Sequence, residues 1–165
     1  MTNGIKVKKR NGRGVEPLDL EKMHKMVEEA TKGITGVSAS QVEIQSGIQF
    51  YDGITTGEIQ EILIKSASDL IDLDNPNYQY VAARLLLFAV RKNLYGKIRE
   101  LPHLENHIYN CTNVDVYDKE IFDKYSKEEI DKANDFIDHE RDFLFTYAGL
   151  RQVVDKYLVQ DRSGG

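Results

Sequence analysis

Apolar and basic residues alternate along the first stretch of the chain, Ile5–Lys9, with the period of two that a half-buried β-strand requires. Asn11-Gly12 follows, and because both residues tolerate positive φ they favour a tight turn. Gly14-Val15-Glu16 supplies a second short strand, and Pro17 ends its pairing because proline has no N–H to donate. The pattern predicts a β-hairpin at the start of the chain.

After the hairpin, apolar residues recur every three or four positions, which is the spacing of amphipathic helices. Three helix starts carry capping residues, namely Asp19, then Ser38 or Ser40, then Thr55 with Glu58 in a capping box. The corresponding predicted helices are 19–32, a short one opening at residue 38 or 40, and 56–70.

A fourth helix opens at Asn75-Pro76, where asparagine is the expected cap and proline takes the first helical position. Between Tyr80 and Val90 this helix is apolar on nearly every side, so it should lie in the middle of a bundle. Gly96 can end it. Residues 1–97 are therefore expected to form one unit, a β-hairpin lid on a four-helix bundle.

The second part of the chain, residues 98–165, begins with a linker-like segment at Leu101–His103 and continues in helical patterns. Residues 157–160 read as a strand, but no second strand follows for them to pair with. We therefore expect a mainly α fold with a small β element, and a chain that is the front end of something longer. The predicted helices lie near 103–112, 119–125, 126–138 and 146–156, the third of them with the capping box Ser126-x-x-Glu129.

The 165 residues carry a net charge of −5, but the charge is unevenly distributed. Residues 1–97 hold 13 Lys and Arg against 12 Asp and Glu, whereas residues 98–165 hold 9 against 15. The first 14 residues contain five bases and no acid. This basic patch indicates either a solvated hairpin or a local anion site, because a nucleic-acid-binding protein is usually basic overall.

Several classes of protein are excluded or disfavoured. The single cysteine, Cys111, excludes an internal disulfide framework and a four-thiolate metal site within this chain. No apolar run reaches the roughly 18 residues of a membrane span, and no signal-peptide pattern opens the chain, so we expect a soluble, cytoplasmic protein. His103 and His107 are four residues apart with Glu105 between them, but the glutamate spacing of a zinc-protease helix is absent, so surface or core histidines are favoured and no metal site is predicted.

Four residues could together bind a phosphate group. Lys9 and Arg10 supply charge and forked donors from the hairpin, and Thr56 offers a hydroxyl beside the free N–H groups of a helix start. Lys92 would have to arrive from the fourth helix. Neither the Gly-x-x-x-x-Gly-Lys-Ser/Thr loop nor Gly-x-Gly-x-x-Gly occurs, so neither standard nucleotide fold is indicated.

Five stretches of the first unit combine into one pattern: Val7–Gly12, Leu18–Met23, Ile48–Thr56, Pro76–Leu85 and Arg91-Lys92. The pattern resembles the ATP-cone, a nucleotide-sensing domain of many ribonucleotide reductase large (alpha) subunits. The stretches 136–142, 145–149 and 156–162 are similar to the helical region that follows the cone in class I (aerobic) reductases of bacteria and their phages. The resemblance covers essentially the whole chain.

The resemblance implies a ligand and a set of binding residues. In that family the cone binds ATP or dATP, here expected with magnesium, and sets overall activity: ATP permits turnover, whereas dATP promotes an inhibited assembly. Carried over by position, the residues expected at the triphosphate are Lys9, Arg10 and Lys92, with Thr56 alongside. Those expected at the base and sugar are Glu16 and Lys22, with Phe88 in the pocket wall.

The resemblance also implies partners. These are the remainder of the reductase alpha subunit and the small radical-bearing beta subunit, assembled in an oligomer. Residues 98–165 would then begin the N-terminal helical domain of the alpha subunit, truncated or split before the catalytic barrel. The catalytic cysteines of the family are missing from this chain, so we expect no catalytic residue or catalytic cofactor in it, and no nucleic-acid partner.

Three departures from the family pattern leave the function open. Gln60 stands where relatives often have histidine, Asp19 where some have asparagine, and the hairpin has one extra residue before Glu16. ATP and dATP differ by one hydroxyl, whose hydrogen bond is worth about 1 kcal/mol, so small changes in the pocket could remove discrimination. The alternatives to a sensor are a degenerate cone kept as an assembly surface and, third, a nucleic-acid-binding helical module.

Overall fold

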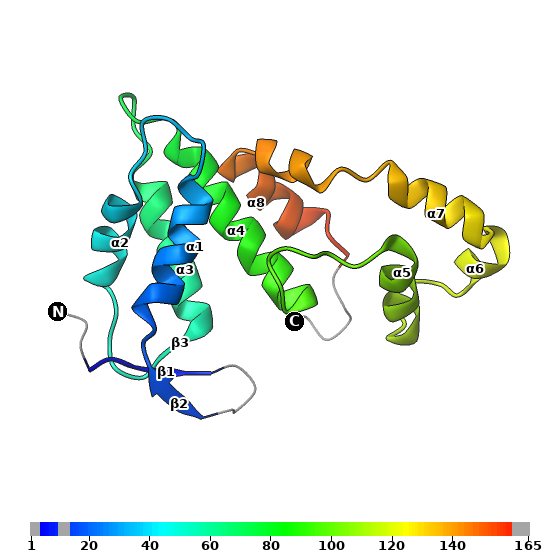
Figure 1. Ribbon diagram of the computed structural model, residues 1–165, viewed down its shortest axis with the longest axis horizontal. Helices are drawn as coiled ribbons and strands as arrows, with labels where there is room; N and C mark the ends of the chain where they lie inside the picture. The colour runs from blue at the N-terminus through cyan, green and yellow to red at the C-terminus, as the bar shows by residue number, and fades with distance from the viewer. Residues whose placement is uncertain (1–3, 10–13, 160–165) are drawn as a thin grey trace.

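The computed structural model of the chain describes residues 4–9 and 14–159, and it is mainly helical with a small sheet, as the sequence predicts (Figure 1). Strands β1 (Lys6–Lys8) and β2 (Val15–Pro17) pair antiparallel, with Val7 opposite Glu16. The predicted turn at Asn11-Gly12 lies outside the described residues. The sheet also contains β3 (Ile54–Thr55), which the sequence analysis did not predict and which pairs parallel to β1.

Beside the sheet stand α1 (Leu20–Thr31), α2 (Ala39–Gly47), α3 (Thr56–Asp69) and α4 (Tyr78–Tyr95). Helix α4 packs against α1 and α3 on one side and against α8 (Tyr147–Lys156) on the other. Its position in the middle confirms the expectation drawn from its apolar surface. Its buried side chains are Tyr78, Val81, Ala82, Ala83, Leu85, Leu86, Leu87, Phe88, Ala89 and Arg91.

The predicted caps of the first three helices are present. The Asp19 carboxylate accepts from the Lys22 N–H, and Ser38, rather than Ser40, accepts from the Gln41 N–H. Thr55 and Glu58 form the complete capping box of α3. Asp and Ser at such positions stabilise a helix because they satisfy N–H groups that have no partner inside it.

The predicted start of α4 at Asn75-Pro76 is wrong by about two residues. The Asn75 side-chain amide donates to the Asp72 carboxylate, and the Tyr78 N–H donates to the Asn75 carbonyl, so residues 75–78 form a turn. Asn77 precedes the helix, and its side chain donates to the Thr35 carbonyl instead of capping α4. The end of the helix agrees with the prediction, because Gly96 takes a left-handed φ of 70°.

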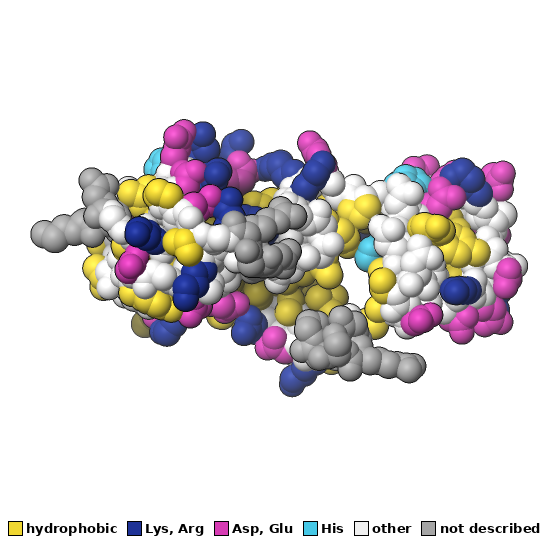
Figure 2. Space-filling model, turned by 90° about the horizontal axis from the view of Figure 1, so that it is seen from below, with side chains coloured by type: hydrophobic (Ala, Val, Ile, Leu, Met, Phe, Trp, Pro, Cys, Tyr) yellow, Lys and Arg dark blue, Asp and Glu magenta, His cyan; other side chains and the backbone are white. Residues whose placement is uncertain are grey.

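The second part of the chain leaves the bundle and then returns to it (Figure 1). Helices α5 (Leu104–Asn113), α6 (Glu120–Lys124) and α7 (Lys127–Asp135) form an arm that projects from the bundle. Figure 2 shows this arm as a lobe on which acidic side chains surround apolar ones. The chain then comes back through the 3-10 helix η2 (His139–Leu144) to α8, and both elements pack on α4.

Two predictions for this part need correction. Helix α7 ends at Asp135 rather than near residue 138, because the Asp138 carboxylate caps the separate helix η2 by accepting from the Glu140 N–H. The predicted strand at 157–160 is wrong for residues 157–159. The N–H groups of Tyr157 and Leu158 both donate to the Val153 carbonyl, which closes α8 in a turn, and Gln160 lies outside the described residues.

One continuous apolar core joins the sheet, the bundle and α8. It includes Val7 from β1, Ile54 from β3 and Leu150 from α8.

Across the part of the chain that the structure describes, no helix combines the length and the apolar character that crossing a membrane requires.

A histidine between two glutamates links α1 to α2. The Nδ1 atom of His24 lies 2.7 Å from Glu43 Oε1, and its Nε2 atom lies 3.2 Å from Glu28 Oε1. The hydrogen bond to Glu43 is the main cause that raises the pKa of His24 above its ordinary value of 6.5. Protonation of His24 therefore stabilises the folded chain.

Stability is accordingly expected to fall as pH rises through the raised pKa of His24. A group with a raised folded-state pKa contributes fully below its unfolded pKa, here about 6.5, and loses that contribution above its folded pKa. We expect the urea midpoint of the chain to decrease between pH 6 and pH 8.5, and this decrease to be smaller in His24→Asn. An identical pH dependence in both proteins would contradict this assignment.

Candidate nucleotide-binding site

A cavity of about 540 Å³ opens where the ends of three helices meet the sheet. It lies between the hairpin strands, the first turns of α1, the start of α3 and the last turns of α4. The lining residues are far apart in the sequence, from Val7 to Gly96, so the cavity forms only when the bundle is folded.

Among the residues that the structure describes, the charged side chains around the cavity are three lysines and two carboxylates. Lys9 Nζ lies 2.6 Å from Glu16 Oε2, and Lys22 Nζ lies 3.1 Å from Asp19 Oδ2. Within residues 4–9 and 14–159, no carboxylate forms an ion pair with Lys92. The described lining therefore has a net positive charge, and its Lys92 ammonium is available to a ligand.

Asp19 and Lys22 influence each other at the start of α1. The pKa of Asp19 is lowered, chiefly because its carboxylate accepts from the Lys22 backbone N–H, and the hydrogen bond to Asp19 raises the pKa of Lys22. Both groups are thus held in their charged forms at neutral pH.

The start of α3 presents a helix N-terminus to the cavity through Thr56. Glu58 fixes this end, because its carboxylate accepts from the Thr55 N–H at 2.8 Å and from the Tyr51 hydroxyl at 2.7 Å. The bond from Tyr51 is also the main cause that lowers the pKa of Glu58. A fixed N-terminus of this kind attracts anions through its free N–H groups and its positive dipole end.

The remaining wall is mostly apolar. A flat ring such as a nucleobase can bury its faces against such a surface. One amide also reaches the wall, that of Gln60, which is only 7% exposed and lies one helical turn after Thr56. Among the described residues, its apolar side chains are those of Val7, Pro17, Leu18, Met23, Met26 and Ile59.

The structure brings most of the sequence-predicted residues together. Lys9, Glu16, Lys22, Thr56 and Lys92 all line the cavity. Arg10 lies outside the described residues.

Phe88, expected in the pocket wall, does not line the cavity. Its side chain is 1% exposed, and its ring meets the ring of Phe143 edge-on at 6.2 Å between centroids. Met23 and Met26 of the wall could not be identified from the sequence, because their helical spacing on α1 is the same for a core residue and for a cavity residue.

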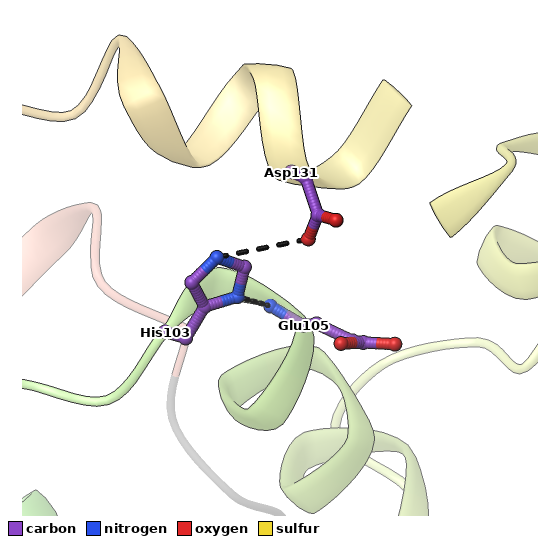
Figure 3. A group of neighbouring side chains, drawn as sticks. All are labelled: His103, Glu105 and Asp131. Carbon is purple, nitrogen blue, oxygen red and sulfur yellow. Dashed lines mark hydrogen bonds and ion pairs between the residues drawn. The ribbon is translucent and has the colours of Figure 1, made fainter. Parts of the chain in front are cut away.

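A second polar group lies in the arm, where His103, Glu105 and Asp131 offer nitrogen and carboxylate atoms within 4.8 Å of one another (Figure 3). The Lys127 ammonium is 2.5 Å from the Glu105 carboxylate and 3.7 Å from that of Asp131, so a cation already balances this pair. His103 Nδ1 accepts from the Glu105 N–H, which leaves the neutral ring's proton on Nε2, towards Asp131. These residues cap α5 and join it to α7.

The family described as ATP cone domain matches residues 5–93, more than half of the chain. The chain therefore belongs to the ATP-cone family, and all cavity residues except Gly96 lie within the matched segment. This confirms the resemblance read from the sequence.

The whole chain is also similar to reductase subunits. It is 45% identical over all 165 residues to ribonucleoside-diphosphate reductase 1 subunit alpha of Escherichia coli and to the alpha subunit of Haemophilus influenzae. It is 42% identical over 152 residues, 91% of the chain, to the alpha subunit of Enterobacteria phage T4. The chain spans 20–22% of the length of these relatives.

Proposed function

We propose that the chain is the activity-controlling region of a ribonucleoside-diphosphate reductase alpha subunit, with ATP or dATP as its allosteric effector. The observation that carries the proposal is the cavity, which lies in the family-matched segment and combines lysines, a helix N-terminus and an apolar wall. These are the features that bind phosphates and a base. The chain itself is not catalytic in this proposal.

The triphosphate lies against Lys9 and Lys92 and over the start of α3 at Thr56, with magnesium on its oxygens. Arg10, next to Lys9 in the sequence, joins them from the hairpin. The sugar and base lie beside Glu16 and Lys22, where carboxylate and ammonium groups can hydrogen-bond to them. Phe88 packs in the core against Phe143 and does not touch the ligand in this proposal.

The proposed partners are the rest of an alpha subunit, which holds the catalytic barrel, and a small radical-bearing beta subunit, within an oligomer in the cytoplasm. Large exposed apolar side chains after residue 97 support such contacts. Phe136 is 87% exposed and Leu144 is 73% exposed, and contact with a partner would remove this apolar surface from water. Residues 1–97 form the regulatory domain in this proposal, and residues 98–165 begin the helical domain that follows it.

Isothermal titration of the 165-residue chain with ATP and then with dATP, each with magnesium, tests the function. We expect saturable binding in the micromolar range, and the ratio of the two affinities reports how well the cavity senses the 2′-hydroxyl. Absence of heat together with an unchanged melting temperature would overturn the proposal. The cone would then be an assembly surface without nucleotide sensing.

The ion pair between Lys9 and Glu16 predicts an effect of Glu16 on phosphate binding. The Glu16 carboxylate holds the Lys9 ammonium and also repels an incoming phosphate, so Glu16→Gln should bind inorganic tripolyphosphate about two- to fivefold more tightly. Glu21→Gln is the matched control, because Glu21 pairs with Lys25 away from the cavity. Titration calorimetry measures both, and equal affinities in the two variants would contradict the prediction.

A further inference from the structure

The last turns of α4 make an unusually complete polar contact with the segment that follows the arm. The Arg91 side chain is only 7% exposed. Its guanidinium donates to the Asp142 carboxylate at 2.7 Å, to the His139 carbonyl at 3.2 Å and to the Ile98 carbonyl at 3.3 Å. A buried arginine with three partners is fixed in place, because losing one partner leaves a charge without compensation.

An aromatic ring completes this contact. The Phe143 ring lies under two guanidinium groups, with Arg84 5.3 Å and Arg91 5.4 Å from its centroid, and meets Phe88 edge-on. Positions 84, 88 and 91 recur at the helical interval, so they form one face of α4. Helix η2 is therefore attached to that face by the ion pair of Asp142 with Arg91 and by the contacts of the Phe143 ring with the two guanidinium groups.

The neighbouring face of the same helical turn lines the cavity. Lys92 follows Arg91 directly, and Gly96, which ends α4, is also a cavity residue. Consecutive residues of an α-helix point about 100° apart, so one turn carries both the cavity lysine and the arginine that holds η2. A ligand that orders or shifts this turn through Lys92 must act on Arg91 as well, since the helix backbone connects them rigidly.

We infer that the contact of Arg91 with Asp142 and Phe143 is the route by which occupancy of the cavity reaches the residues after the cone. The inference rests on the proposed function, because it concerns the regulation of the same site. Nucleotide on Lys92 orders the end of α4, and the ordered turn holds η2 and α8 more firmly. By linkage, weakening the contact with η2 weakens nucleotide binding by the same factor that binding strengthens the contact.

Hydrogen exchange measured by mass spectrometry on the 165-residue chain, with and without ATP and magnesium, tests the route. We expect ATP to slow exchange in the cavity segments and also, by at least about threefold, in residues 139–156. In Asp142→Asn, ATP should still protect the cavity segments, with an affinity lowered a few-fold, but the protection of residues 139–156 should be lost. Asp155→Asn is the matched control, because Asp155 pairs with Arg151 on the exposed side of α8.

The outcomes separate the route from the function. Protection of the cavity segments without protection of residues 139–156, or equal behaviour of the Asp142 and Asp155 variants, overturns the route and leaves the proposed function standing. Absence of ATP binding by titration overturns both. If Asp142→Asn is unfolded by circular dichroism, Phe143→Leu, which keeps the ion pair and removes the ring, replaces it with the same expected loss of protection.

Discussion

Replacing Lys92 with alanine is expected to weaken ATP binding by about 10- to 100-fold. A hydrogen bond to a charged group contributes about 1.5–3 kcal/mol, and 1.4 kcal/mol corresponds to a factor of ten in affinity. Lys92 has no competing carboxylate within the described part of the cavity, so a triphosphate gains its full interaction. Isothermal titration of the variant with ATP and magnesium measures the loss.

Lys9→Ala should weaken binding at least as strongly. Its removal takes away one cation and also leaves the Glu16 carboxylate facing the phosphates without a partner. The control is Lys65→Ala on α3, which makes the same change of charge at a lysine that pairs with Asp69 and does not line the cavity. If the Lys9 and Lys92 variants both bind ATP like the unchanged chain, the proposed site is wrong.

The sequence was most informative where structure depends on neighbouring residues. Asp19, Ser38, Thr55 and Ser126 all cap helices as predicted, because a cap needs only a side-chain oxygen and an N–H two or three residues away. Strand β3 was missed because its two residues carry no periodicity of their own. It exists through a parallel pairing with β1, 47 residues earlier in the chain at Val7 and Ile54.

For the site, charge and family resemblance identified the cations, but not the shape of the cavity. Lys9 and Lys92 could be named in advance, whereas the apolar wall could not. Met23, Met26 and the buried Val27 all stand at apolar positions of the helical pattern of α1. Only the arrangement of the hairpin and α3 around that helix decides which of these side chains lines the cavity.

The return of η2 and α8 to α4 explains why Phe88 is a core residue and does not line the cavity as predicted. A helix that is apolar on nearly every side is surrounded by protein, but its sequence does not say which element covers which face. The linker at Leu101–His103 gave no sign that residues 139–156 come back to α4. In the structure they do, and the Phe143 ring meets the Phe88 ring edge-on.

Phe88→Ala is accordingly expected to lower the free energy of unfolding by about 3–5 kcal/mol, the cost typical of removing a buried phenylalanine ring. The ring is 1% exposed and also loses its edge contact with Phe143. Urea denaturation followed by circular dichroism measures the change. The control is Tyr157→Ala, which removes a ring that is 71% exposed and should change stability by less than about 1 kcal/mol.

Phe88→Leu separates a core role from a binding role, because leucine keeps most of the buried volume and the chain should stay folded. Since the ring does not line the cavity, ATP affinity should fall by no more than about threefold, through the weakened support of α4, whereas Lys92→Ala loses at least tenfold. A folded Phe88→Leu protein that loses as much ATP affinity as Lys92→Ala would contradict the buried position. It would place the ring against the nucleotide, as the resemblance to the ATP-cone implied.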